Sequence, residues 1–279
     1  MALKTYYWDQ RTVSLYKYYK YKFRHPERIV FKYGNAGDIF NIDLIRYLYN
    51  ETTTNIKDEG NRLLMVGSIV SKIREGDIVN GIGSKGDDMP KNTSLMSTLK
   101  INGVRGPLTR SLFEKCGADL SNLKFEYDPG LLIKEVYNID LNRSCEKQII
   151  FLPHFRDFNV YKNNYPKDIK VVSLDKNPKK IAKEILKSKI VYASSLHGVI
   201  FSHALNKPCV FVRPQSDEPI FKYQDYFLSI GLDLPNAVSD IYSINYMTDK
   251  ETVLNRKIGL KDFYFPKTEM LKETGVING

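Results

Sequence analysis

Residues 193–212 read ASSLHGVIFSHALNKPCVFV, the pattern of one strand–helix–strand unit with a polar turn in it. The segment Lys189–Tyr192 before them is β-branched and aromatic, which predicts a buried strand. Val199–Leu205 has the apolar spacing of a helix, and Asn206-Lys207-Pro208 ends it before a second strand. Ligands bind at the carboxyl ends of strands in open α/β sheets, and the free amides of a following helix attract anions. The turn therefore predicts a site for an anionic ligand.

Similar strand-then-helix units occur along the whole chain. Strands that alternate with helices predict parallel sheets, so we expect an α/β protein with two Rossmann-like lobes that face a cleft. We place the lobes at 1–135 and 136–279, joined by the polar segment Lys134–Lys147, and expect the tail after Asp262 to pack back or fray. The expected strands are Arg28–Tyr33, Arg62–Val70, Asp77–Gly81, Lys100–Val104, Gln148–Leu152 and Ile169–Leu174, and the expected helices are Phe40–Tyr49, Leu108–Cys116 and Pro178–Ser188.

Composition narrows the class of protein. The 279 residues contain no apolar run long enough to span a membrane, and Met1–Trp8 lacks the layout of a secretory signal, so the cytoplasm is the expected location. Three distant cysteines and no Cys/His cluster give no sign of a disulfide framework or a metal site, and we expect each cysteine to be a core residue. The cysteines are Cys116, Cys145 and Cys209.

The charge balance is basic and uneven. The chain has 42 Lys and Arg against 32 Asp and Glu, a net charge of +10, which suits an anionic partner. Tyr16–His25 interleaves basic and aromatic residues. Such a segment can stack nucleic-acid bases, lie at an anionic lipid surface, or form a solvated helix or strand edge. Since the chain has no recognised nucleic-acid-binding motif, a nucleic acid is the least expected of these partners.

Two glycine-rich turns follow expected strands. In the turn that runs from Gly34 to Asn41, the glycines permit close approach of a ligand, and Asp38 either caps the next helix or orients and deprotonates a hydroxyl. The turn Gly81–Asp88 loosely resembles a phosphate loop but lacks the Walker spacing.

Two further turns carry single residues suited to anions. Arg105 stands before the helix that begins near Pro107, where a guanidinium suits a phosphate or carboxylate, although a plain surface ion pair remains open. His197 is the expected functional residue of the Ser-Ser-Leu-His-Gly turn, and Ser194 and Ser195 are expected hydrogen-bond donors to an anion. No Gly-x-Ser-x-Gly elbow is present, which argues against a serine hydrolase.

Taken together, these turns resemble the motifs of the polysaccharide pyruvyltransferase family, in the family's order. The similar segments are Asn35–Asn41, Val104–Arg110, Asp128–Leu132, Pro153–Phe155, Ser194–Phe201, Ala204–Val212 and Phe221–Phe227. The resemblance implies a glycosyltransferase-B-like fold. It also implies an exopolysaccharide-type ketal pyruvyltransferase. Such an enzyme moves pyruvate from phosphoenolpyruvate onto a sugar of a bacterial surface polysaccharide or its lipid-linked precursor, at the inner face of the membrane, and releases phosphate.

The resemblance also implies roles for particular residues, without a metal or a cofactor. His197 is the expected acid or phosphate-stabilising group, and Arg105 and Asp38 are the other expected catalytic residues. Many members have Arg where this chain has Ser195, so Arg156 or Arg213 is expected to replace that contact with the donor. The expected donor-binding residues are Arg105, His154, Arg156, Ser194, Ser195, His197, Gly198, Arg213 and Lys222, and the expected acceptor-binding residues are Asn35, Asp38 and Asn41.

Two other functions remain open on sequence grounds. A nucleotide-sugar glycosyltransferase on the same fold would also place cations against a diphosphate, because fold alone does not fix function. A basic nucleic-acid-binding protein would explain the net charge and the Tyr16–His25 segment.

Overall fold

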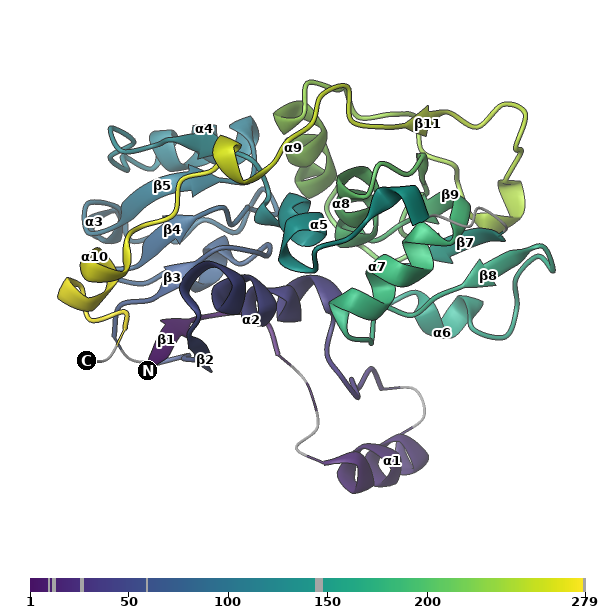
Figure 1. The fold of residues 1–279 in the computed structure, drawn as a ribbon, viewed down its shortest axis with the longest axis horizontal. Coiled ribbons are helices and arrows are strands. Elements are labelled where there is room, and N and C mark those ends of the chain that lie inside the picture. The colour runs from purple at the N-terminus through teal and green to yellow at the C-terminus, as the bar shows by residue number, and fades with distance from the viewer. Residues whose placement is uncertain (10, 12–13, 26–27, 59, 144–147, 278–279) are drawn as a thin grey trace.

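The protein is an α/β protein with largely parallel sheets, as predicted (Figure 1). A computed structural model describes residues 1–9, 11, 14–25, 28–58, 60–143 and 148–277. The strands are β1 (Ala2–Thr5), β2 (Thr52–Asn55), β3 (Leu63–Leu64), β4 (Ile78–Asn80), β5 (Lys100–Val104), β6 (Phe125–Glu126), β7 (Gln148–Leu152), β8 (Ile169–Val171), β9 (Ser188–Ala193), β10 (Cys209–Phe211) and β11 (Glu251–Thr252). The helices are α1 (Leu15–Arg24), α2 (Ala36–Tyr49), α3 (Thr93–Met96), α4 (Pro107–Lys115), α5 (Ile133–Val136), α6 (Phe158–Tyr161), α7 (Pro178–Leu186), α8 (Leu196–Ala204), α9 (Phe221–Ser229) and α10 (Thr268–Glu273).

Two main sheets come from different parts of the chain. Strands β3, β4, β5 and β6 pair in that order, and every pair is parallel. The second sheet has the order β11-β10-β9-β7-β8, and its edge strand β11 is antiparallel to β10. The division into lobes 1–135 and 136–279 and the glycosyltransferase-B-like arrangement stay predictions.

The predicted unit around residues 193–212 is present. β9, α8 and β10 follow one another, and β9 pairs in parallel with β10 through Val191 and Cys209. Asn206 takes a positive φ of 55° directly after α8, a conformation that asparagine tolerates better than most residues. The strand–helix–strand pattern was therefore sufficient to predict this part of the fold.

A single apolar cluster connects the two sheets through α2. Helix α2 packs against α7 and α8, and the rings of Phe40 and Phe201 lie 5.6 Å apart, edge to face. The same cluster includes Leu3 near the N-terminus and Ile277 at the C-terminal end of the described residues. The C-terminal segment also returns to the first sheet, since Asn80 Nδ2 donates to the carbonyl of Tyr264 at 3.0 Å.

Some predicted boundaries were wrong. Arg28–Tyr33 is not a strand: its one bridge joins Phe31 to Arg11, because the amides of Lys32 and Tyr33 donate to the carboxylate of Asp175 and not to a neighbouring strand. The strand predicted over Arg62–Val70 is limited to β3, after which Gly67 turns the chain with a φ of +128°. The polar segment that was expected from Lys134 to Lys147 begins inside α5, and Cys145 lies outside the described residues.

Helices α4 and α9 are joined by a buried ion pair. Arg105 Nε lies 3.1 Å from Asp225 Oδ2, and both side chains are almost fully buried. Asp225 also accepts hydrogen bonds from the amide of Thr109 at 2.9 Å and from its hydroxyl at 2.6 Å, so it caps the first turn of α4. Gly106 permits this approach, since a Cβ there would lie 2.2 Å from the carbonyl oxygen of Asp225.

We predict that Asp225→Asn lowers the free energy of unfolding by about 3–5 kcal/mol, because it leaves the Arg105 guanidinium buried without a counter-charge. Urea unfolding measures this loss. The matched control is Asp233→Asn, which removes an exposed carboxyl and should change stability by less than about 0.5 kcal/mol. Equal stability of the two variants would contradict the role assigned to the pair.

Candidate active site

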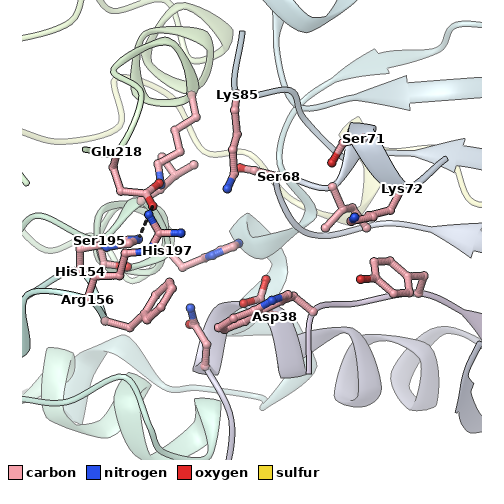
Figure 2. Close-up of a pocket in the computed structure, with 17 residues that line it drawn as sticks. Asp38, Ser68, Ser71, Lys72, Lys85, His154, Arg156, Ser195, His197 and Glu218 are labelled. Atoms are coloured by element: carbon pink, nitrogen blue, oxygen red, sulfur yellow. Dashed lines mark hydrogen bonds and ion pairs between the residues drawn. The ribbon is translucent and has the colours of Figure 1, made fainter. Parts of the chain in front are cut away.

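A pocket of about 310 Å³ lies where loops from both main sheets meet (Figure 2). Its walls come from segments that follow β1, β3, β4, β7, β9 and β10, and from the first turns of α2, α8 and α9. The carboxyl ends of parallel strands are the expected place for a ligand. The lining residues are Tyr6, Trp8, Asn35, Asp38, Ser68, Ile69, Ser71, Lys72, Lys85, His154, Phe155, Arg156, Ser195, Leu196, His197, Glu218 and Lys222.

Two helix N-termini border the pocket. Asn35 is the N-cap of α2, where its side chain accepts from the amide of Gly37 at 3.1 Å, and Asp38 lies in the first turn. Ser195 is the N-cap of α8, and His197 lies in the first turn of that helix. The partial positive charge at both helix starts favours an anion between them.

Gly37 brings these two helix starts into contact. A Cβ on Gly37 would lie 2.0 Å from His197 Nδ1, so the imidazole packs directly on the backbone of α2. Asp38, the residue after Gly37, lines the same pocket as His197. Asp38 and His197, two of the three expected catalytic residues, thus lie in the first turns of α2 and α8, which come together because Gly37 has no side chain.

Burial makes His197 neutral near pH 7. It lowers the pKa of His197 to about 3, and the nearby charges of Arg105 and Lys222 act in the same direction. Its Nε2 is buried and has no hydrogen-bond partner among the described residues. The sequence interpretation relied on the ordinary pKa of histidine, near the working pH, whereas the imidazole in the folded protein is suited to hydrogen bonding in its neutral form.

The pKa of Asp38 is shifted in the opposite direction, upward. Burial raises its pKa to about 7, although the charges of Lys222 and Lys85 oppose the rise. A carboxyl group with this pKa is present in both protonation states near neutral pH. Asp38 can therefore give or take a proton at the pocket floor.

Arg156 and Lys222 form what we call the cationic wall of the pocket, and one carboxylate, that of Glu218, holds them together. Glu218 Oε2 lies 2.5 Å from Lys222 Nζ, and its Oε1 lies 3.1 Å from a guanidinium nitrogen of Arg156 and 3.5 Å from His154 Nε2. Burial is the largest influence and raises the pKa of Glu218, but the charge and hydrogen bond of Lys222, together with the other positive groups nearby, hold the pKa below its ordinary value. Lys85 points into the pocket from the first sheet and faces this wall (Figure 2). The charges suit a ligand with more than one negative group.

His154 contributes a neutral ring to the same wall. Burial lowers its pKa to about 3, helped by the positive charge of Lys222, and Glu218 only partly offsets this. Its amide donates to Ser194 Oγ at 2.9 Å, so Ser194 fixes the end of β7 and does not line the pocket.

Several other expected ligand contacts are also absent from the pocket lining. Arg105 is fully buried, and besides Asp225 it donates to Ser68 Oγ at 2.8 Å and to the carbonyl of Ser84. It therefore holds two loops beside the pocket in place, in a buried ion pair and not in the surface ion pair that the sequence left open. Gly198 packs on the side chain of Leu152. Arg213 is exposed and does not line the pocket.

Asn41 is also structural. Its Nδ2 donates to the carbonyls of Asp38 and Val66 at 2.9 Å, and its Oδ1 accepts from the amide of Val66. These bonds tie α2 to the loop after β3. The expected site residues that do line the pocket are Asn35, Asp38, His154, Arg156, Ser195, His197 and Lys222.

Sequence reasoning missed Glu218, Lys72 and Lys85 as site residues. Lys85 could have been predicted, because it lies in the Gly81–Asp88 turn, which loosely resembles a phosphate loop. The carboxylate of Asp88 accepts from the amide of Lys85 at 2.9 Å, which fixes that turn. Glu218 and Lys72 could not have been predicted as site residues, since each lies in a segment without a recognisable motif. Across the described part of the chain, no group of three or more His, Cys, Asp or Glu residues could hold a metal ion.

Comparison with known proteins agrees with the motifs. The family model described as polysaccharide pyruvyl transferase matches residues 6–216, which confirms the predicted resemblance. An uncharacterized protein of Acanthamoeba polyphaga mimivirus is 25% identical over 211 residues, covering 71% of this chain and 72% of that protein. No solved structure matches the chain.

We predict that Asp38 makes stability fall as the pH rises from about 4 to about 7. Its pKa is about 7 in the folded protein against 3.8 for an ordinary Asp, so in this window the folded state binds a proton that the unfolded chain has lost. Asp38→Asn should remove that fall, a change of about 4 kcal/mol across the window. Urea unfolding at several pH values measures it.

The control for this experiment is Asp87→Asn, which removes an exposed carboxyl near the pocket and should keep the pH dependence of the parent. If the free energy of unfolding depends on pH in the same way for the parent and for Asp38→Asn, Asp38 does not keep its proton in the folded protein between about pH 4 and pH 7.

Proposed function

Because the chain belongs to the polysaccharide pyruvyl transferase family, we propose that it transfers pyruvate from phosphoenolpyruvate onto a sugar. The acceptor is a surface polysaccharide or its lipid-linked precursor, and the products are a cyclic ketal and phosphate. The cationic wall supports this proposal most, since Lys85, Arg156 and Lys222 gather in the pocket that also holds Asp38. Phosphoenolpyruvate carries a phosphate and a carboxylate, and cationic side chains bind both.

Glu218 gives this wall its geometry. It neutralises part of the charge of Lys222 and Arg156 and fixes the positions of their head groups. Lys85 and Lys72 also line the pocket, so positive charge remains to meet the phosphate and the carboxylate of the donor.

Asp38 is the proposed acid and base. In its protonated form it gives its proton to the methylene carbon, while a sugar hydroxyl attacks the neighbouring carbon of the donor. The Asp38 carboxylate that results then takes the proton of the attacking hydroxyl, which restores protonated Asp38. The tetrahedral intermediate loses phosphate as a second hydroxyl closes the ketal, and the second hydroxyl proton leaves with the phosphate. One pKa near 7 serves both transfers.

His197 is the proposed hydrogen-bond donor to the phosphate. Its neutral imidazole has a buried Nε2 with no partner among the residues described, and such a group gains a full hydrogen bond when a ligand supplies an acceptor. An anionic phosphate next to the ring also raises the pKa of the imidazole, which strengthens the contact as phosphate leaves.

We predict that His197→Ala abolishes phosphate release from phosphoenolpyruvate, which requires at least about a hundredfold loss of kcat, and leaves the fold intact. The assay follows phosphate in the presence of soluble glycosides that offer two neighbouring hydroxyls, and circular dichroism checks the fold. His197→Gln retains a donor and should recover part of the activity.

Two outcomes would count against these assignments. Near-normal turnover by a folded His197→Ala variant would remove His197 from the mechanism. Release of nucleoside diphosphate from a nucleotide sugar, with no phosphate from phosphoenolpyruvate, would favour a glycosyltransferase on this fold.

We predict that Arg156 and not Arg213 replaces the arginine that many family members have at the position of Ser195. Arg156→Ala should raise the KM for phosphoenolpyruvate at least about tenfold, because Arg156 lines the pocket and a charged hydrogen bond contributes about 1.5–3 kcal/mol. The matched control Arg213→Ala should leave KM unchanged, since Arg213 is exposed outside the pocket. The reverse result would assign the donor contact to Arg213.

A further inference from the structure

Helix α1 projects from the body of the protein (Figure 1) and meets it through one side, where Tyr18 and Lys22 line a cavity next to α6. None of its ten residues is buried, and all four of its charged residues are basic. Helices of this length are marginal alone in water and are usually stabilised by burying one face. An exposed helix with apolar side chains therefore indicates a surface that binds something else.

The outward side of α1 is apolar and aromatic. Leu15, Tyr16, Tyr19 and Phe23 fall within an arc of about 100° on a helix with 3.6 residues per turn. Their exposed fractions are 54%, 73%, 58% and 88%. Tyr18, on another side of the helix, is half-buried and lines a cavity of about 230 Å³ next to α6. The helix thus directs its largest apolar side chains toward solvent.

Cations border this apolar arc. The next positions around the helix lie about 40° to 100° beyond Tyr16. They are occupied by Lys20, Arg24 and Lys17, and all three side chains are exposed. Lys20 Nζ lies 5.8 Å from the ring centroid of Tyr16. An apolar arc beside a basic flank is typical of helices that lie in the headgroup region of a bilayer, where lysine side chains reach the phosphates.

We propose that α1 is a docking helix for an anionic membrane surface. The apolar arc inserts among the lipid headgroups, and the basic flank contacts their phosphates. No helix in the described residues is long and apolar enough to cross a membrane, so this contact is made at the surface. It concerns lipid binding alone and can be tested without any substrate of the proposed reaction.

The chain on both sides of α1 is anchored at the pocket. On one side, Trp8 lines the pocket, and its ring lies 5.1 Å from that of Phe155. On the other, the carboxylate of Asp175 accepts from the amides of residues 32, 33 and 34 at 2.8, 2.7 and 3.0 Å, immediately before Asn35. Docking of α1 therefore brings the pocket close to the lipid surface, where a lipid-linked sugar would be within reach.

A single-stranded nucleic acid fits this surface less well. Such ligands bind in grooves that follow the backbone and stack bases on aromatic rings. The cavity next to α6 is lined from α1 by Tyr18 and Lys22 and not by the apolar arc, and the side chains of Leu15 and Phe23 have no polar atom for the edge of a base. Insertion into lipid gives both side chains an apolar environment.

The test is co-sedimentation of the full chain with vesicles of phosphatidylcholine, with and without phosphatidylglycerol. We expect binding only to the anionic vesicles, and weaker binding as ionic strength rises. Lys17→Glu combined with Lys20→Glu should weaken binding at least about tenfold, since basic residues near an anionic surface are attracted to it and acidic ones are repelled. Leu15→Ser combined with Phe23→Ser should also weaken it at least about tenfold, through lost apolar burial.

Matched controls separate α1 from general effects of charge and hydrophobicity. Lys115→Glu with Lys187→Glu makes the same change in net charge on other exposed positions, and Val160→Ser with Met247→Ser removes exposed apolar side chains elsewhere. Both controls should bind as the parent does. No binding of the parent to anionic vesicles at low ionic strength, or equal losses in the controls, would overturn the proposal. Binding of oligo(dT) that depends on α1, without vesicle binding, would assign the surface to nucleic acid.

Discussion

The buried contact between Arg105 and Asp225 connects the parts of the protein that shape the pocket. Arg105 follows β5 in the first sheet, and Asp225 lies on α9, which follows β10 of the second sheet. A buried charge left without its partner costs several kcal/mol, so this contact restricts how α4 and α9 can be placed. Because Arg105 also holds Ser68 and Ser84, and α9 carries Lys222, the pair fixes opposite walls of the pocket at once.

The same pocket shows how burial can reverse expectations based on residue type. Histidine is the side chain whose ordinary pKa lies nearest to neutrality, yet desolvation leaves both His154 and His197 neutral. Desolvation moves the carboxyl of Asp38 in the other direction, toward neutral pH. In both cases the charged form is penalised because it loses water, which is why we propose the carboxyl and not the imidazole as the acid and base.

The cationic wall depends on a carboxylate that opposes its charge. Lys222 is almost fully buried, and burial lowers its pKa, whereas Glu218 at 2.5 Å raises it. Without Glu218, the burial of Lys222 near the charges of Lys85 and Arg105 would favour loss of its proton. An acidic residue inside an anion site is therefore consistent with the binding of anions, because it keeps the cations charged and in place.

The sequence by itself determined the α/β class, the β9–α8–β10 unit, the family and seven of the residues that line the pocket. These depend on local patterns: apolar spacing along single elements, helix starts, and motifs in a fixed order. It could not distinguish an arginine that lines the pocket, Arg156, from one that is buried in an ion pair, Arg105, because the difference depends on neighbours far along the chain, Glu218 for Arg156 and Asp225 for Arg105. The tertiary structure alone decided the pKa values of Asp38 and His197, the part played by Glu218, and the exposure of the apolar side of α1. Each of these depends on burial, and burial is set by segments that are far apart in the chain.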